Sequence, residues 1–181
     1  MLLPVIAVFG QDLPKPVKHL VKQLKKRGAD TILVYISGCD GCFIRRKNIN
    51  CTCFKKESIT EVSLIFSIKG KFNKEDFSCC QDSALTEINA PESIRYFLSL
   101  QDTLKKKDEY YKQAAKRLEF FPPIATDNPY EQVELIIPGH NYDVSLSYWQ
   151  INDGYQAWKK YFWIESEIKL MDLIRKDISV H

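Results

Sequence analysis

The chain has 181 residues, of which 45% are hydrophobic and 27% charged, and its formal net charge is +3. This length and balance predict one globular α/β domain over residues 1–181 and argue against a disordered chain. No apolar run approaches the roughly 18 residues of a membrane helix, so we expect no membrane association. The apolar start, Met1 to Phe9, predicts a buried strand. A signal peptide is the minor alternative, because this run lacks a basic n-region and a small-residue cleavage site. We therefore expect an intracellular, cytoplasmic protein.

The first forty residues predict a strand, a helix and a second strand. After the strand at Met1 to Phe9, a helix ends at Gly28, which is a common terminator. Its apolar residues recur at helical spacing: Val17, Leu20, Val21 and Leu24. Thr31 to Ile36 is a continuous apolar run, as in parallel strands covered by helices on both faces. Together these elements predict a βαβ unit within a central mixed sheet.

The rest of the chain predicts one further strand, a hairpin and two helices. Ile59 to Ile68 is rich in β-branched residues and predicts a strand, whereas Gly70 to Asp82 predicts a polar loop. A long helix is expected from Asn89 to about Glu119. A β-hairpin follows between Val133 and Tyr148, and a last helix runs from Asn152 or Asp153 to about Asp177.

Large apolar side chains crowd the first half of that last helix. They are Tyr155, Trp158, Tyr161, Phe162, Trp163 and Ile164. Such a wide apolar surface indicates a helix that is buried on more than one side, or one that offers a surface to a partner. We predict a protein partner at this aromatic C-terminal helix.

All six cysteines lie between positions 39 and 80, and the first pair, Cys39 and Cys42, has C-x-x-C spacing directly after the apolar run. This spacing has two common uses, reversible disulfide exchange and metal chelation. We interpret residues 39–58 as a cysteine-rich insertion within the domain.

The order of the elements resembles the thioredoxin fold. In that family a C-x-x-C motif follows a central strand, and a proline, usually cis, precedes the strand that opens the terminal hairpin. The run from Ile32 to Cys42 and Pro129 stand at these two places. The resemblance implies a thiol–disulfide redox protein in which Cys39 attacks, Cys42 resolves and Pro129 shapes the substrate groove.

Local charges bear on this redox chemistry in both directions. A thiolate at a strand end that leads into a helix is stabilised by the positive end of the helix. Arg45, Arg46 and Lys47 would lower the thiol pKa further. The neighbouring carboxylate of Asp40 would act against the thiolate.

The metal alternative uses four cysteines as ligands of one zinc ion. They are Cys39, Cys42, Cys51 and Cys53, and four thiolates make a closed, tetrahedral structural site. The chain would then be a non-enzymatic, zinc-stabilised binding module that docks onto nucleic acid or a larger protein assembly. The zinc and redox hypotheses both stay open at this point.

Basic residues on the first helix and in the cysteine segment could form a phosphate-binding face for nucleic acid. They are Lys18, Lys22, Lys25, Arg45, Arg46 and Lys47. The alternative is a solvated helix face, because lysines at this spacing commonly keep a surface helix in contact with water. The solvated face is the favoured interpretation, and nucleic acid stays the alternative partner for these six residues.

Overall fold

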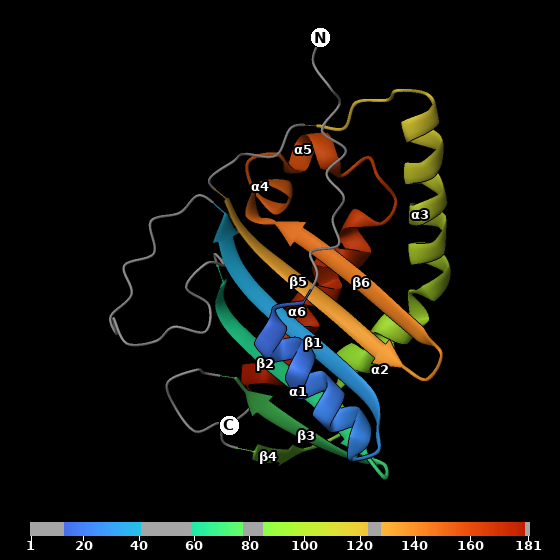
Figure 1. Ribbon diagram of the computed structural model, residues 1–181. Coiled ribbons are helices and arrows are strands. Elements are labelled where there is room, and N and C mark those ends of the chain that lie inside the picture. Colours follow the sequence, from blue (N-terminus) through green and yellow to red (C-terminus); the bar gives the residue numbers. More distant parts are fainter. Residues whose placement is uncertain (1–12, 41–58, 78–84, 123–127, 180–181) are drawn as a thin grey trace.

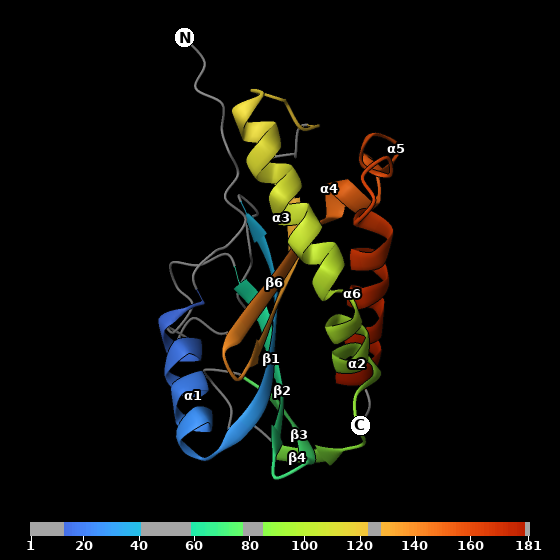
Figure 2. The ribbon, with the colours of Figure 1, turned by 90° about the vertical axis from the view of Figure 1, so that its right-hand side faces the viewer.

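The computed structural model of the protein describes residues 13–40, 59–77, 85–122 and 128–179, and the structural statements below refer to these ranges. They form three layers, which are one helix, a six-stranded sheet and a set of helices on its other face (Figure 1, Figure 2). The strands are β1 (Ala29–Asp40), β2 (Ile59–Ile68), β3 (Lys71–Asp76), β4 (Leu85–Ile88), β5 (Asn128–Ile137) and β6 (His140–Ser147). The helices are α1 (Lys15–Lys26), α2 (Glu92–Ser99), α3 (Gln101–Lys116), α4 (Tyr148–Ile151), α5 (Tyr155–Trp158) and α6 (Ile164–Ser179).

The sheet is antiparallel throughout, in the order β4-β3-β2-β1-β5-β6. Strand β1 lies at its centre, between β2 and β5. Because both edges of β1 have antiparallel partners, the prediction of a mixed sheet is wrong for these strands. The combination of helices and strands is confirmed. The thioredoxin-like order stays a prediction, because Met1 to Phe9 and the segment from Gly41 to Glu57 lie outside the described residues.

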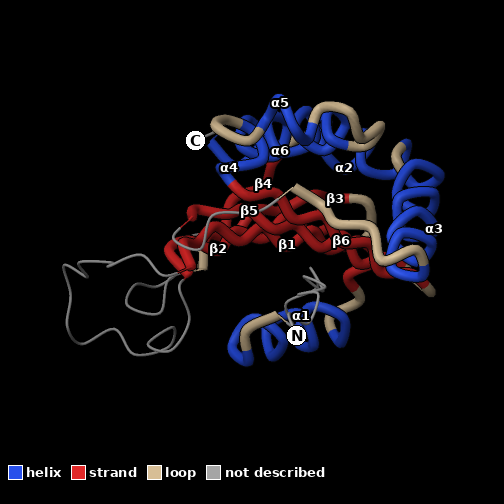
Figure 3. Tube along the Cα trace, turned by 90° about the horizontal axis from the view of Figure 1, so that it is seen from above, coloured by secondary structure: helices blue, strands red, loops and turns tan. Residues whose placement is uncertain are grey.

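The apolar run in β1 results from burial on both faces and not from a parallel arrangement. Ile32, Val34 and Ile36 pack in the cluster beneath α1, whereas Leu33 and Tyr35 pack in the cluster beneath the other helices. Figure 3 shows these helices on opposite sides of the sheet. Since Ile32 to Ile36 are buried on both faces of the strand, neither face needs polar residues there. A continuous apolar run therefore indicates burial without indicating strand direction.

Helix α1 has the apolar face and the end that its sequence predicts. Val17 and Leu24 are fully buried and Val21 nearly so, against the apolar residues of β1 and β2. Gly28 follows the helix with a φ of +87°, a conformation that glycine adopts without strain. This single helix lies on one face of the sheet (Figure 2).

Strand β3 lies within the segment from Gly70 to Asp82, for which the sequence predicts a polar loop. Lys69 and Gly70 both have positive φ and form the tight turn that leads from β2 into β3. The strand pattern is hidden because an inward-facing position is a lysine, Lys74, which is only 4% exposed. Its ammonium donates a hydrogen bond to the carbonyl of Ile178 near the end of α6, where a positive charge is favourable.

The long helix predicted from Asn89 to Glu119 is divided at Leu100 into α2 and α3. Helix α2 packs on α6, and Asp177 of α6 caps it by accepting the backbone N–H of Ser93 at 2.9 Å. The predicted last helix is also divided, into the short helix α5 and the longer helix α6, and α4 lies ahead of its predicted start. Both predicted helices are therefore interrupted within segments that show helical periodicity.

The aromatic residues ahead of α6 belong to the core. Trp158, Tyr161 and Trp163 are at most 5% exposed, and only Phe162 is half-exposed, at 53%. They pack with rings from the region of α3, such as Tyr110, whose centroid lies 5.3 Å from that of Trp163. Most of these rings are buried, as the first of the two predicted alternatives requires, but they lie on α5 and in the turns before α6 and not on one continuous helix. A protein partner at this segment stays a prediction.

Candidate functional site

Cys39 is the part of the predicted redox motif that the structure describes. It lies at the end of the central strand β1, is 6% exposed and is disulfide-bonded. The other five cysteines lie outside the described residues, and with them the predicted partner Cys42 and the zinc ligands Cys51 and Cys53. A sulfur atom in a disulfide is not a thiolate and so does not ligate zinc in this state. Exchange at Cys39 and a zinc site at the four cysteines both stay predictions, because the disulfide partner and the other proposed ligands lie outside the described residues.

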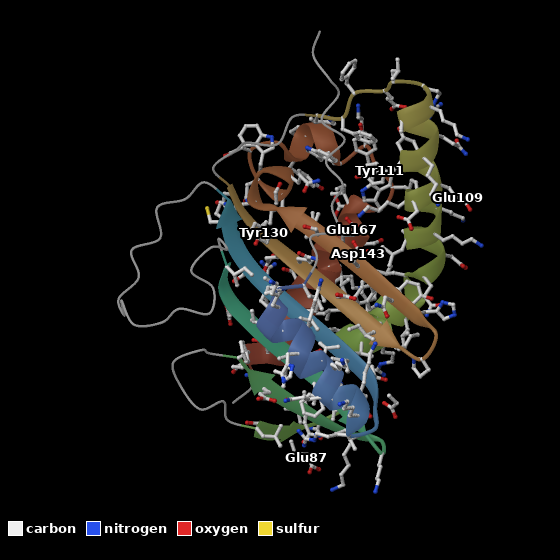
Figure 4. The ribbon with its side chains drawn as sticks, viewed as in Figure 1. Glu87, Glu109, Tyr111, Tyr130, Asp143 and Glu167 are labelled. Carbon is white, nitrogen blue, oxygen red and sulfur yellow. The ribbon has the colours of Figure 1, made fainter. Side chains whose placement is uncertain are left out.

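Pro129 lies directly opposite Cys39, as its partner on the neighbouring strand β5. The sequence separates the two residues by almost half the chain, and the antiparallel pairing of β1 with β5 brings them together. Tyr130, which marks this end of the sheet in Figure 4, is paired with Gly38. No peptide bond in the described ranges is cis, so the bond before Pro129 is trans. In the thioredoxin family, which the order of elements resembles, the corresponding bond is usually cis.

Pro129 limits the hydrogen bonds that this end of the sheet can form. A proline has no backbone N–H, so at this position β5 cannot donate a hydrogen bond to a neighbouring strand. Pro129 is exposed and Tyr130 is half-buried, so both border the surface next to the disulfide. A substrate chain that approaches Cys39 would therefore contact a rigid, apolar residue.

Two of the three predicted nucleic-acid residues of α1 lie close to carboxylates of the sheet. Lys18, Lys22 and Lys25 are all exposed, but Lys18 and Lys25 line a groove whose opposite side carries carboxylates. The remaining predicted residues, Arg45, Arg46 and Lys47, lie outside the described residues. Nucleic-acid binding stays a prediction, and part of its predicted charge is locally compensated.

That groove lies between α1 and the outer strands β5 and β6, and it has a volume of about 380 Å³. Its polar lining comes from both the helix and the sheet: Lys18, Lys25, Gln132, Glu134, Asn141 and Asp143. Glu134 and Asp143 are direct cross-strand partners. The amide of Asn141 donates a hydrogen bond of 3.1 Å to Oε1 of Glu134. The groove thus combines two carboxylates, two ammonium groups and two amides.

The two carboxyl groups of this groove titrate above their usual range. Burial is the largest cause of the raised pKa of Glu134, and repulsion by the charge of Asp143 adds to it, while Lys25 and Lys18 oppose it. Loss of hydration at the carboxyl group also raises the pKa of Asp143, although much of that residue is accessible to solvent. Sequence reasoning missed this pair. The signal was the alternation of polar residues at positions 132, 134, 141 and 143, which places them on one face of a hairpin.

A third carboxyl group, that of Glu167 on α6, lies in the helical layer and is 1% exposed. It forms an ion pair with Lys107 of α3, and this ammonium also lies 5.9 Å from the ring centre of Tyr111. Burial raises the pKa of Glu167, and the charge of Lys107 opposes the rise. Figure 4 shows Glu167 and Tyr111 on the inner side of α3, and Glu109 on its outer side. This pair joins α3 to α6, and we assign it a structural role.

Comparison with known proteins gives the chain no family: no protein-family model matches it, and no curated protein matches its sequence. Within the described ranges, no helix is both long and apolar enough to cross a membrane. A proposal for function must therefore start from Cys39 and its surroundings.

Proposed function

We propose that the protein exchanges thiols and disulfides at Cys39, with Cys42 as the second cysteine of the pair. The observation that supports this most is the position of Cys39, which is disulfide-bonded at the end of the central strand and directly opposite Pro129. This combination of a strand-end cysteine and a facing proline joins two residues that the sequence analysis selected separately. Exchange at this site is the activity that the resemblance to thioredoxins implies.

The reaction has two steps. The thiolate of Cys39 attacks one sulfur of a substrate disulfide, and the other substrate sulfur leaves as a thiolate. The thiolate of Cys42 then attacks the sulfur of Cys39 and releases the remaining substrate thiol. The protein dithiol loses two electrons to become a disulfide, and the substrate disulfide gains two.

The surroundings of Cys39 would restrict which substrates react. Because Cys39 is 6% exposed, a substrate sulfur would reach it through only a small opening. Pro129 would present a fixed surface to that substrate, since its ring holds φ in one narrow range. Exchange would therefore be faster with extended peptide disulfides than with compact proteins.

Reduction of insulin disulfides tests the proposal. The wild-type protein, recycled by dithiothreitol, is expected to accelerate reduction, and Cys39→Ser to abolish the acceleration while circular dichroism shows an intact fold. Equal activity in Cys39→Ser would end the hypothesis.

A second variant covers the case in which Cys39→Ser does not fold. Cys42→Ser keeps the attacking sulfur and removes the resolving one, so it should accumulate a mixed disulfide between Cys39 and an insulin chain. Mass spectrometry of the alkylated protein would detect this adduct. Its absence from a folded Cys42→Ser protein would contradict the proposed roles.

A further inference from the structure

The groove between α1 and the β5–β6 hairpin is a separate site, distant in sequence from the cysteine motif. We propose that it binds a neutral, polyhydroxylated ligand, that is, a mono- or disaccharide unit. The groove encloses about 380 Å³, at the small end of the roughly 300–1,000 Å³ of ligand pockets. One or two sugar rings fit a volume of this size.

The charges of the groove argue for a neutral ligand. Glu134 and Asp143 contribute two negative charges from the sheet, and Lys18 and Lys25 contribute two positive charges from α1. An anion would approach the carboxylates, and a cation would approach the ammonium groups, so each would meet repulsion together with attraction. A neutral ligand meets neither, and it can use all four groups as hydrogen-bonding partners.

The types of hydrogen-bonding group fit hydroxyls. Carboxylates such as Glu134 accept hydrogen bonds, ammonium groups donate them, and the side-chain amides of Gln132 and Asn141 do both. A sugar hydroxyl also donates and accepts, so it can bridge neighbouring groups of opposite character. A ring that carries several hydroxyls can thus form hydrogen bonds with adjacent carboxylate, amide and ammonium groups.

The apolar part of the lining completes the match. Leu13 and Val21 come from the helix side, and Ile136 comes from the sheet. These side chains would contact the C–H face of a sugar ring while the polar groups bind its hydroxyl edge.

Titration of the ¹⁵N-labelled full chain with glucose, galactose, N-acetylglucosamine, cellobiose and lactose would test this proposal. We expect at least one of them to shift amide resonances of α1, β5 and β6 and to leave those of β3 and β4 unchanged. Because the ligand is neutral, the affinity should not change with added salt. Glu134→Ala and Asn141→Ala should each weaken binding at least tenfold.

Glu109→Ala is the matched control, since Glu109 is exposed on the outer side of α3 (Figure 4). It should bind the sugar as the wild type does. The proposal is overturned if none of the five sugars shifts the groove resonances, or if Glu134→Ala binds as tightly as Glu109→Ala. It is also overturned if spermidine or inorganic phosphate binds the groove with a steep salt dependence while the sugars do not. None of these three results depends on the activity of Cys39.

Discussion

Cys39 of β1 and Pro129 of β5 occupy directly opposite positions in the antiparallel sheet. The pairing continues on both sides of them, through Gly38 with Tyr130 and Asp40 with Asn128. Cys39 is therefore held in place by strand pairing, next to a residue that has no backbone N–H to donate.

The first prediction concerns Pro129. Replacing it by alanine restores a backbone N–H and frees φ, so a docked substrate would meet a less rigid surface. We expect Pro129→Ala to slow insulin reduction several-fold with little change in the melting temperature. Pro138→Ala is the matched control, because Pro138 is also exposed but lies in the β5–β6 turn. Equal rates in the two variants would remove Pro129 from the substrate site.

The second prediction concerns the buried ion pair in the helical layer. Lys107→Met leaves Glu167 buried without its partner, which costs about 3–5 kcal/mol of unfolding free energy. Urea unfolding at neutral pH measures this cost. Lys106→Met, at the exposed neighbouring position, should stay within about 0.5 kcal/mol of the wild type. If both lysine variants unfold alike, the pair does not hold α3 on α6.

The third prediction concerns pH. Glu134, Asp143 and Glu167 all have a raised pKa in the folded protein. In the pH range between the unfolded and folded pKa values, the folded state binds more protons, so stability falls as the pH rises through that range. We therefore expect the unfolding free energy to increase when the pH is lowered from about 7 to about 5. The increase in unfolding free energy should be smaller in Glu134→Gln than in the wild type. In the exposed control Glu109→Gln it should equal that of the wild type. An increase of equal size in both variants would contradict the burial of Glu134.

The fourth prediction distinguishes a buried aromatic segment from a binding surface. Trp163 is 1% exposed, so Trp163→Ala should destabilise the protein by about 3–5 kcal/mol. The adjacent Phe162 is half-exposed, and Phe162→Ala should cost about 1 kcal/mol or less. Thermal and urea unfolding of the two variants give the comparison. Similar small losses in both would mean that Trp163 does not belong to the core.

The sequence predicted those elements whose own residues show the burial pattern. Helix α1, strands β1 and β2 and the β5–β6 hairpin lie where hydrophobic periodicity places them. The sequence did not predict that β1 is antiparallel to its neighbours. An apolar run indicates that both faces of a strand are covered, but it does not indicate which strands lie beside it. The sequence also missed β3, because the inward-facing position is Lys74, whose ammonium pairs with Asp76 and donates a hydrogen bond to the carbonyl of Ile178 near the end of α6, a contact that no local pattern reveals.

The two candidate sites also differ in whether the sequence alone could predict them. Cys39 and Pro129 could be selected from spacing and from their places in the order of elements, and the register of β1 with β5 joins them. The pair of Glu134 and Asp143 could not be selected, because each is an ordinary polar residue of a strand that alternates in polarity. The electrostatics of Glu134 depend on Lys18 and Lys25 of α1, and those of Asp143 on Lys107 and Asp108 of α3, so both are set by distant parts of the chain.

The most direct test of the central claim is the reduction potential of the disulfide at Cys39. The full chain would be equilibrated in a series of glutathione redox buffers, and the oxidised fraction of Cys39 measured by alkylation and mass spectrometry. Exchange proteins have potentials between about −120 and −270 mV, and we expect a value in this range. A potential below about −300 mV is that of a structural disulfide and would contradict the account.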